Sequence, residues 1–115
     1  MRRELLIEAT CHCGAVKVAV AKAPDAVKDC NCSICHRYGT LWAYYTLDQV
    51  TVAGATDVYM WSDRELGFHR CRTCGCVTHW WPVDESHNRM GVNANLMPRE
   101  VLAKATVTAF DGASM

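Results

Sequence analysis

Residues 29–39 read Asp29-Cys30-Asn31-Cys32-Ser33-Ile34-Cys35-His36-Arg37-Tyr38-Gly39 and carry three cysteines in the spacing C-x-C-x2-C. A strand or helix packed into a hydrophobic core has no need of thiols at this density. A Zn²⁺ ion does, because turns with this spacing aim several thiolates at one point about 2.3 Å away. The stretch therefore predicts a metal site around which the chain folds.

Two further cysteine clusters flank this stretch. Cys11-His12-Cys13 precedes it, and Cys71-Arg72-Thr73-Cys74-Gly75-Cys76 follows it. The number of ligands is informative, because structural zinc is closed by four protein ligands. Catalytic zinc commonly keeps three ligands and leaves the fourth position for water or substrate. A trio in the middle of the chain is therefore a candidate reactive site.

A disulfide framework is the alternative explanation for eight cysteines in a chain of 115 residues. The amino terminus has no apolar segment of the kind that a secretory signal requires. Cysteines at C-x-C spacing on an extended chain also point to opposite faces, so close neighbours rarely pair. Metal thiolates in a reducing compartment are the favoured interpretation.

Length and composition restrict the class of protein. A chain of 115 residues is predicted to be a single domain spanning residues 1–115. Twelve basic and twelve acidic side chains cancel, so no basic surface indicates nucleic acid as a partner. No apolar run approaches the length that spans a membrane. We expect a soluble, cytoplasmic protein without a nucleic-acid or membrane partner, and its oligomeric state is left open.

Hydrophobic periodicity predicts an all-β fold with little helix. Val16, Val18 and Val20 alternate with smaller or charged residues, as on a strand with one buried face. A helical turn or loop is expected at 36–39, and one helical turn at 97–102. Strands are expected at 4–10, 14–21, 41–47, 50–52, 58–61, 77–81, 90–96 and 106–110, with a turn at 62–67. Because such short strands enclose a small core, metal cross-links are the expected supplement.

The order of the motifs resembles the glutathione-dependent formaldehyde-activating (GFA) family. The matching pieces are Cys11-His12-Cys13-Gly14-Ala15-Val16, Cys30-Asn31-Cys32-Ser33-Ile34-Cys35 with Arg37 and Gly39, Cys71-Arg72-Thr73-Cys74-Gly75, Met90-Gly91-Val92-Asn93 with Leu96, and Phe110-Asp111-Gly112. They cover residues 4 to 112. Seven cysteines in this register carry most of the signal.

The resemblance implies a small β-tent of packed antiparallel sheets cross-linked by two zinc ions. A structural zinc would be held by Cys11, Cys13, Cys71 and Cys74, and a three-thiolate zinc with an open position by Cys30, Cys32 and Cys35. The family's founding activity is condensation of formaldehyde with glutathione to S-hydroxymethylglutathione, classed as a carbon–sulfur lyase reaction. A shared fold does not by itself determine the substrate.

An open three-thiolate zinc suits capture of a thiol, because a bound cation lowers the pKa of a thiol. Cys30, Cys32, Cys35 and Arg37 are therefore the candidate catalytic residues, with a small-molecule thiol such as glutathione and an aldehyde such as formaldehyde as substrates. Arg37 is the nearest candidate cation for an anionic thiol, with Arg70 and Arg72 behind it; a solvated surface charge is the alternative for Arg37.

Two alternatives stay open at the level of sequence. The central zinc is either open or closed by another protein ligand, and Cys76 is either that ligand or a small buried residue. A closed site favours a non-catalytic, zinc-stabilised module that binds glutathione or a protein.

Aromatic and amide side chains form a second group of candidates. Trp42, Tyr44, Trp80 and Trp81 either form the wall of a pocket beside the open zinc or belong to the core. Asn93 and Asn95 either hold a peptide-like ligand or occupy a surface face. The sequence does not decide between these roles.

Overall fold

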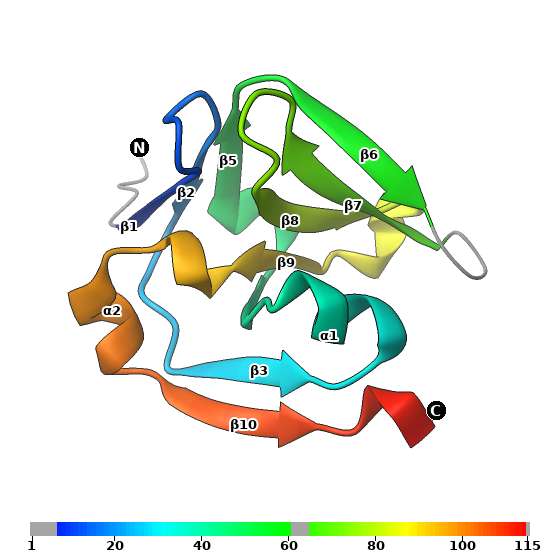
Figure 1. Cartoon of the computed structure of the whole chain (residues 1–115). Coiled ribbons are helices and arrows are strands. Elements are labelled where there is room, and N and C mark those ends of the chain that lie inside the picture. The colour runs from blue at the N-terminus through cyan, green and yellow to red at the C-terminus, as the bar shows by residue number, and fades with distance from the viewer. Residues whose placement is uncertain (1–6, 61–64, 115) are drawn as a thin grey trace.

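Two β-sheets make up most of the structure, a computed structural model that describes residues 7–60 and 65–114 (Figure 1). The smaller sheet has the strand order β1 (Ile7–Thr10), β2 (Lys17–Val20) and β5 (Val50–Ala53). The larger sheet has the order β10 (Thr106–Phe110), β3 (Ala26–Cys30), β4 (Trp42–Tyr45), β9 (Met90–Asn93), β8 (Val77–Pro82), β7 (Leu66–Cys71) and β6 (Thr56–Met60). The all-β class is confirmed.

Helices are short and connect or cover these sheets. The α-helices are α1 (Ser33–Tyr38) and α2 (Arg99–Ala103), and the 3-10 turns are η1 (Leu47–Gln49), η2 (Glu85–His87), η3 (Ala94–Leu96) and η4 (Gly112–Ser114). In Figure 1, α1 lies between the β3–β10 pair and the strands β7 to β9. Within the described ranges, no helix is long and apolar enough to cross a membrane.

The parallel pairing of β10 with β3 departs from the expected antiparallel arrangement. Thr106 pairs with Ala26 and Phe110 pairs with Cys30, whereas the other strand pairs are antiparallel. A parallel neighbour needs a long crossover rather than a tight hairpin, so periodicity alone could not reveal it. As a result, Phe110 at the end of β10 lies beside Cys30, the first cysteine of the central trio.

The main core lies where the two sheets meet. The predicted alternation is confirmed, since Val16, Val18 and Val20 are fully buried. They pack in one cluster with Met90 and Val92 of the larger sheet and with the sulfur-bearing residues Cys11 and Cys71. The thiols of the first site are thus part of the apolar contact between the sheets.

Several predicted boundaries are wrong in detail. The strand expected at 90–96 ends at Asn93, because the Asn93 side chain accepts a hydrogen bond from the Asn95 amide and begins η3. The helix expected at 36–39 already begins at Ser33, where the Cys32 sulfur caps it. Residues 4–6 and 61–64 of the expected strands and turn lie outside the described residues, and β7 begins at Leu66.

Two stacked histidines join β7 and β8. His69 and His79 face each other with ring centroids 4.3 Å apart, and His79 is only 3% exposed. Burial and, to a smaller extent, the neighbouring His69 together lower the pKa of His79 from 6.5 to about 3. His79 is therefore neutral in the folded protein at neutral pH.

We expect this histidine to make stability fall as the pH decreases from 6.5 towards 3. In this window the unfolded chain binds a proton at residue 79 that the folded protein does not, so folding stability declines by up to about 1.4 kcal/mol per pH unit. The measurement is denaturant unfolding between pH 6.5 and 5.5 of the wild type and of His79→Gln, which has no ionisable group. Equal pH slopes for the two proteins would contradict the expectation.

Candidate metal centres and an adjoining cavity

Four thiols from two hairpin loops meet at the contact between the sheets. Cys11 and Cys13 come from the β1–β2 connection, Cys71 ends β7, and Cys74 lies in the β7–β8 connection. Their sulfur atoms all lie within 4.8 Å of one another, with 3.7 Å between Cys11 and Cys13 and 3.6 Å between Cys13 and Cys71. The structure therefore brings together the four residues assigned to the structural site.

Backbone amides of the two loops point at these sulfur atoms. The Val16 amide donates to Cys11 Sγ at 3.3 Å, and the Thr73 and Cys74 amides donate to Cys71 Sγ. The Cys76 amide is the main cause that lowers the pKa of the Cys74 thiol, to about 5. Donors of this kind favour the thiolate form, which is the form that binds a metal.

The three central thiols form a second cluster at the start of α1. Cys30 ends β3, Cys32 caps the helix, and Cys35 lies in its first turn. Their sulfur atoms also lie within 4.8 Å of one another. Across residues 7–60 and 65–114, no fourth Cys, His, Asp or Glu joins this trio. Cys76 packs instead against the main core, next to the first site.

The three thiols differ in their surroundings. Burial acts to raise the pKa of Cys32, but hydrogen bonds from the Cys35 and Ile34 amides and from the neighbouring thiols outweigh this effect and lower it. Burial raises the pKa of Cys35 to about 12. The indole nitrogen of Trp42, which is 2% exposed, donates to Cys35 Sγ at 3.2 Å and orients it. A thiol with so high a pKa becomes a thiolate only beside a strong positive charge such as a metal ion.

Both clusters fit zinc. Four thiolates bound to zinc at about 2.3 Å in a tetrahedron lie about 3.8 Å apart, close to the sulfur separations of the first cluster. All eight cysteines are free thiols, so none is withdrawn into a disulfide. Soft thiolates select zinc over the hard ions magnesium and calcium. The first group can close a four-coordinate site, and the second can supply three ligands.

Hydrogen bonds to Asn31 hold the carboxyl-terminal segment against the central trio of thiols. The Asn31 amide donates to Phe110 O, the Asn31 side chain donates to Asp111 Oδ1 at 3.1 Å, and the Ala113 amide donates to Asn31 Oδ1 at 2.9 Å. Gly112 is thereby pressed against the thiols, since a Cβ atom there would lie 2.7 Å from Cys30 Sγ. This contact accounts physically for the motif Phe110-Asp111-Gly112.

A small cavity of about 170 Å³ opens beside two of the three thiols. Its lining comes from strands that are far apart in sequence. The lining residues are Cys30, Cys35, Trp42, Tyr44, Leu66, Phe68, Trp80 and Phe110. The pocket interpretation therefore holds for Trp42, Tyr44 and Trp80, whereas Trp81 lines a different cavity with His69 and His79. Sequence inspection missed Leu66, Phe68 and Phe110, which carry no chemical signal of their own.

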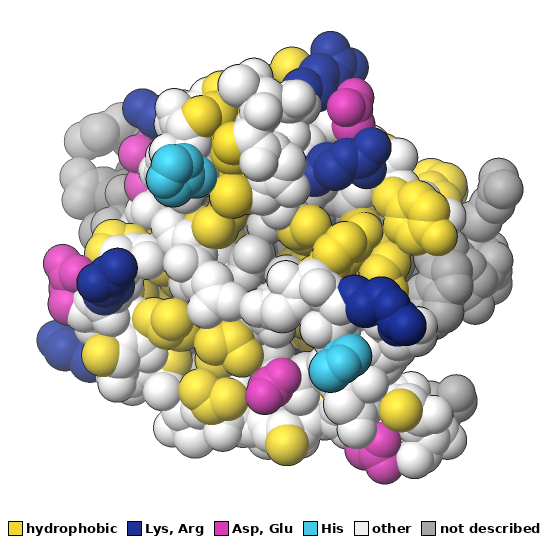
Figure 2. Space-filling view, in the orientation of Figure 1, with side chains coloured by type: hydrophobic (Ala, Val, Ile, Leu, Met, Phe, Trp, Pro, Cys, Tyr) yellow, Lys and Arg dark blue, Asp and Glu magenta, His cyan; other side chains and the backbone are white. Residues whose placement is uncertain are grey.

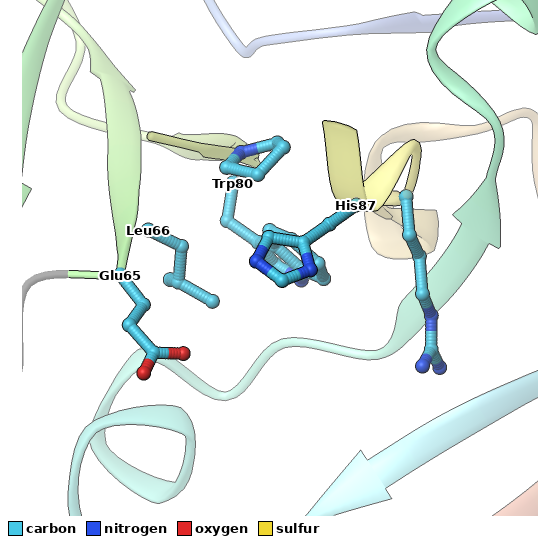
Figure 3. A pocket seen from close by; sticks show the side chains of 6 residues that line it. Glu65, Leu66, Trp80 and His87 are labelled. Carbon is cyan, nitrogen blue, oxygen red and sulfur yellow. The ribbon is translucent and has the colours of Figure 1, made fainter. Parts of the chain in front are cut away.

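Two larger cavities adjoin the inner one. The first, of about 320 Å³, is lined by Glu65, Leu66, Trp80, Pro82, His87 and Arg89. Figure 3 shows Glu65 on one side of it and His87 on the other, with Leu66 between them. The second, of about 370 Å³, is lined by Lys22, Tyr44, Tyr45, Thr46, Gln49, His87, Asn88 and Arg89. Leu66, Trp80 and Tyr44 are shared with the inner cavity.

The remaining candidates occupy other places. Arg37 donates to the backbone and side-chain oxygens of Ser33 at 3.0 Å, and it lines a separate cavity on the outer side of α1 with Tyr38 and Tyr59. Its assignment as a catalytic residue stays a prediction. Arg72 forms an exposed ion pair with Asp57 at 2.9 Å. Charges of both signs are interspersed on the face shown in Figure 2.

The two asparagines have structural roles. Asn93 is buried and donates to Val77 O at 2.8 Å, which joins β9 to β8. Asn95 is exposed and donates to Gly39 O at 2.9 Å, which holds the end of α1. Neither asparagine lines the cavity beside the thiols.

Comparisons with known proteins agree with this arrangement. The family model "Glutathione-dependent formaldehyde-activating enzyme" matches residues 6–111. A crystal structure of a Rhodobacter sphaeroides protein, solved as a structural-genomics target, is similar with a TM-score of 0.71 and 30% sequence identity, covering 88% of this chain and 99% of that one. No curated protein matches the chain. The family's description points to glutathione as a substrate or partner and to formaldehyde activation. Because the match covers nearly all of the sequence, the chain belongs to the family of glutathione-dependent formaldehyde-activating enzymes.

Proposed function

We propose that this chain is a zinc-dependent carbon–sulfur lyase-type enzyme that joins a thiol, glutathione or a relative, to an aldehyde such as formaldehyde. The observation that carries the proposal is the shared cavity. Cys30 and Cys35 line the same open cavity as a set of aromatic side chains, so a substrate in it would lie against the thiol cluster. Of the four-cysteine cluster, Cys11 and Cys71 lie in the main core and Cys74 packs against it, and the cluster has a stabilising role in this proposal.

Cys30, Cys32 and Cys35 would hold the zinc, and its positive charge would lower the pKa of an incoming thiol and so favour the thiolate. The chain's own residues orient and shield the reactants. Trp42 fixes the position of Cys35 through its indole N–H. Trp80 and Phe68 form apolar walls that limit the access of water to the aldehyde. Exclusion of water matters because it strengthens electrostatic interactions in the site.

The addition itself needs a nucleophile and a proton. The thiolate sulfur attacks the aldehyde carbon, a C–S bond forms, and the π electrons of the carbonyl move to its oxygen, which takes up one proton. Outside the thiol trio, Tyr44 is the cavity-lining residue that carries an ionisable proton. Burial raises the pKa of Tyr44, although the neighbouring Arg89 opposes this, so its hydroxyl stays protonated. We assign Tyr44 as the proton donor to the carbonyl oxygen. The proton that the thiol releases on binding then returns the Tyr44 hydroxyl to its protonated form.

The test is the rate at which the zinc-loaded protein accelerates the exchange between formaldehyde, glutathione and S-hydroxymethylglutathione, followed by NMR exchange spectroscopy at equilibrium. We expect the wild type to accelerate the exchange over the uncatalysed rate, Cys32→Ala to abolish the acceleration while keeping the fold, and Tyr44→Phe to reduce it about 10²-fold. Cys76→Ala is the control, since that thiol belongs to neither cluster.

Other outcomes would decide against the proposal. If the intact, metal-loaded protein gives no acceleration, the enzyme interpretation fails for this pair of substrates. Binding of glutathione without acceleration would favour the non-catalytic binding module instead.

A further inference from the structure

The size of the inner cavity limits what it can hold. Sites that enclose a whole drug-sized ligand measure about 300–1,000 Å³, and the cavity beside the thiols measures about 170 Å³. A thiol group and a one-carbon aldehyde fit such a space, but a tripeptide does not. The rest of a larger thiol must therefore extend past Tyr44, Leu66 and Trp80 into the adjoining cavities, which share these residues.

Arg89 lies where the two outer cavities meet, since it lines both. Its guanidinium carbon lies 4.1 Å from the centre of the Tyr44 ring, an arrangement that holds the cation in place through its attraction to the ring face. Neither Arg72–Asp57 nor His87–Asp84 involves Arg89, and within residues 7–60 and 65–114 its guanidinium forms no ion pair. The planar fork of its N–H donors is left to bind a ligand.

The second outer cavity suits an anionic ligand better than the first. Glu65 lines the first cavity with Arg89 and would oppose an anion there, whereas the residues that line the second include Lys22, His87 and Arg89 and no acidic side chain. A guanidinium binds a carboxylate through two parallel hydrogen bonds, which gives geometric selectivity as well as affinity. Tyr44 connects this cationic rim to the thiol cluster, because its ring contacts Arg89 and also lines the inner cavity.

We propose that Arg89 is a specificity-determining residue that selects thiols bearing a carboxylate. The inference rests on the proposed function in one respect, namely that the thiol enters the cavity beside Cys30 and Cys35. In the bound state the sulfur lies at the inner end, the apolar or peptide part crosses Tyr44 and Trp80, and a carboxylate pairs with Arg89. Peptide-like acidic thiols are the substrate class that this arrangement fits.

The experiment compares binding of glutathione with binding of its diethyl ester, in which both carboxylates are masked, to the zinc-loaded protein by isothermal titration calorimetry. We expect the wild type to bind glutathione about tenfold more tightly than the ester, and Arg89→Gln to bring this ratio close to one. Arg99→Gln on α2 is the matched control that should keep the wild-type ratio. Added salt should weaken binding of glutathione more than that of the ester.

Three results would overturn the inference: a ratio near one in the wild type, an unchanged ratio in Arg89→Gln, or no binding of either thiol. Its failure is separable from failure of the proposed function. Accelerated formaldehyde exchange with equal efficiency for glutathione and the ester would leave the enzyme proposal intact and refute the role of Arg89. Selective binding that depends on Arg89, without any acceleration, would support the selectivity and refute the enzyme.

Discussion

Cys71→Ala is expected to leave the protein unfolded at room temperature. Cys71 is 2% exposed and belongs both to the four-thiol cluster and to the core that joins the two sheets. A structural zinc contributes an apparent free energy on the order of 10 kcal/mol to the folding of small domains, while the total stability of a domain is about 5–15 kcal/mol. Loss of one ligand therefore removes most of the stability.

The matched control is Cys76→Ala in the same loop. Cys76 is only partly buried and packs at the edge of the core without joining either thiol cluster. We expect a loss of about 1 kcal/mol, the usual size for a single substitution. The measurements are the zinc content of the purified proteins and thermal unfolding followed by circular dichroism. Equal zinc content and equal melting temperatures for Cys71→Ala and wild type would refute the structural role of the quartet.

Gly112→Val is expected to disrupt the central site while the first site survives. A Cβ atom at residue 112 would lie 2.7 Å from Cys30 Sγ and 3.0 Å from Cys32 Cβ. Ordinary van der Waals contact begins at 3.4 Å, so the Cys30 sulfur would have to move by about 0.7 Å. Metal–ligand distances tolerate only about ±0.2 Å. The variant should hold one zinc ion instead of two, and a displacement of this size can reduce a rate by about 10²-fold.

Ala113→Val is the control for Gly112→Val, because residue 113 is exposed and its contact with Asn31 uses the backbone amide, which the substitution keeps. Zinc content by mass spectrometry under native conditions and the rate of formaldehyde exchange are the two readouts. Two zinc ions and an unchanged rate in Gly112→Val would show that the carboxyl-terminal segment does not support the trio. Unfolding of Gly112→Val would show that the carboxyl-terminal segment stabilises the whole fold, and would contradict a local effect.

The alternation of short strands predicted the fold class correctly, because the pattern of buried valines depends only on which face of a strand is covered. Boundaries were harder to predict. The Cys32 sulfur and the Asn93 side chain each begin a helical turn by hydrogen bonding to a backbone amide. Such local hydrogen bonds compete with continuation of a strand, and hydrophobic periodicity does not register them.

The positions of Arg37 and Arg89 show a second limit of reasoning from the sequence. Arg37 is close to the trio in sequence, but on α1 its side chain turns back to Ser33. Arg89 is distant in sequence and lines the two outer cavities, because β4 pairs with β9 and β9 pairs with β8, which places the loop after β8 beside Tyr44. The neighbours of Arg89 therefore depend on strand pairing between distant segments, which the spacing of residues along the chain does not reveal.

By itself, the sequence determined which neighbouring sulfurs belong together, since one or two residues between cysteines leave the chain little freedom in where the thiols point. The resemblance to the family implied that Cys11 and Cys13 join Cys71 and Cys74. Only the tertiary structure decided what surrounds them. The parallel pairing of β10 with β3 brings Gly112 against Cys30, and the order of strands across the larger sheet gathers the aromatic lining and Arg89. Those contacts depend on strand pairings between distant segments, which a local spacing of residues does not encode.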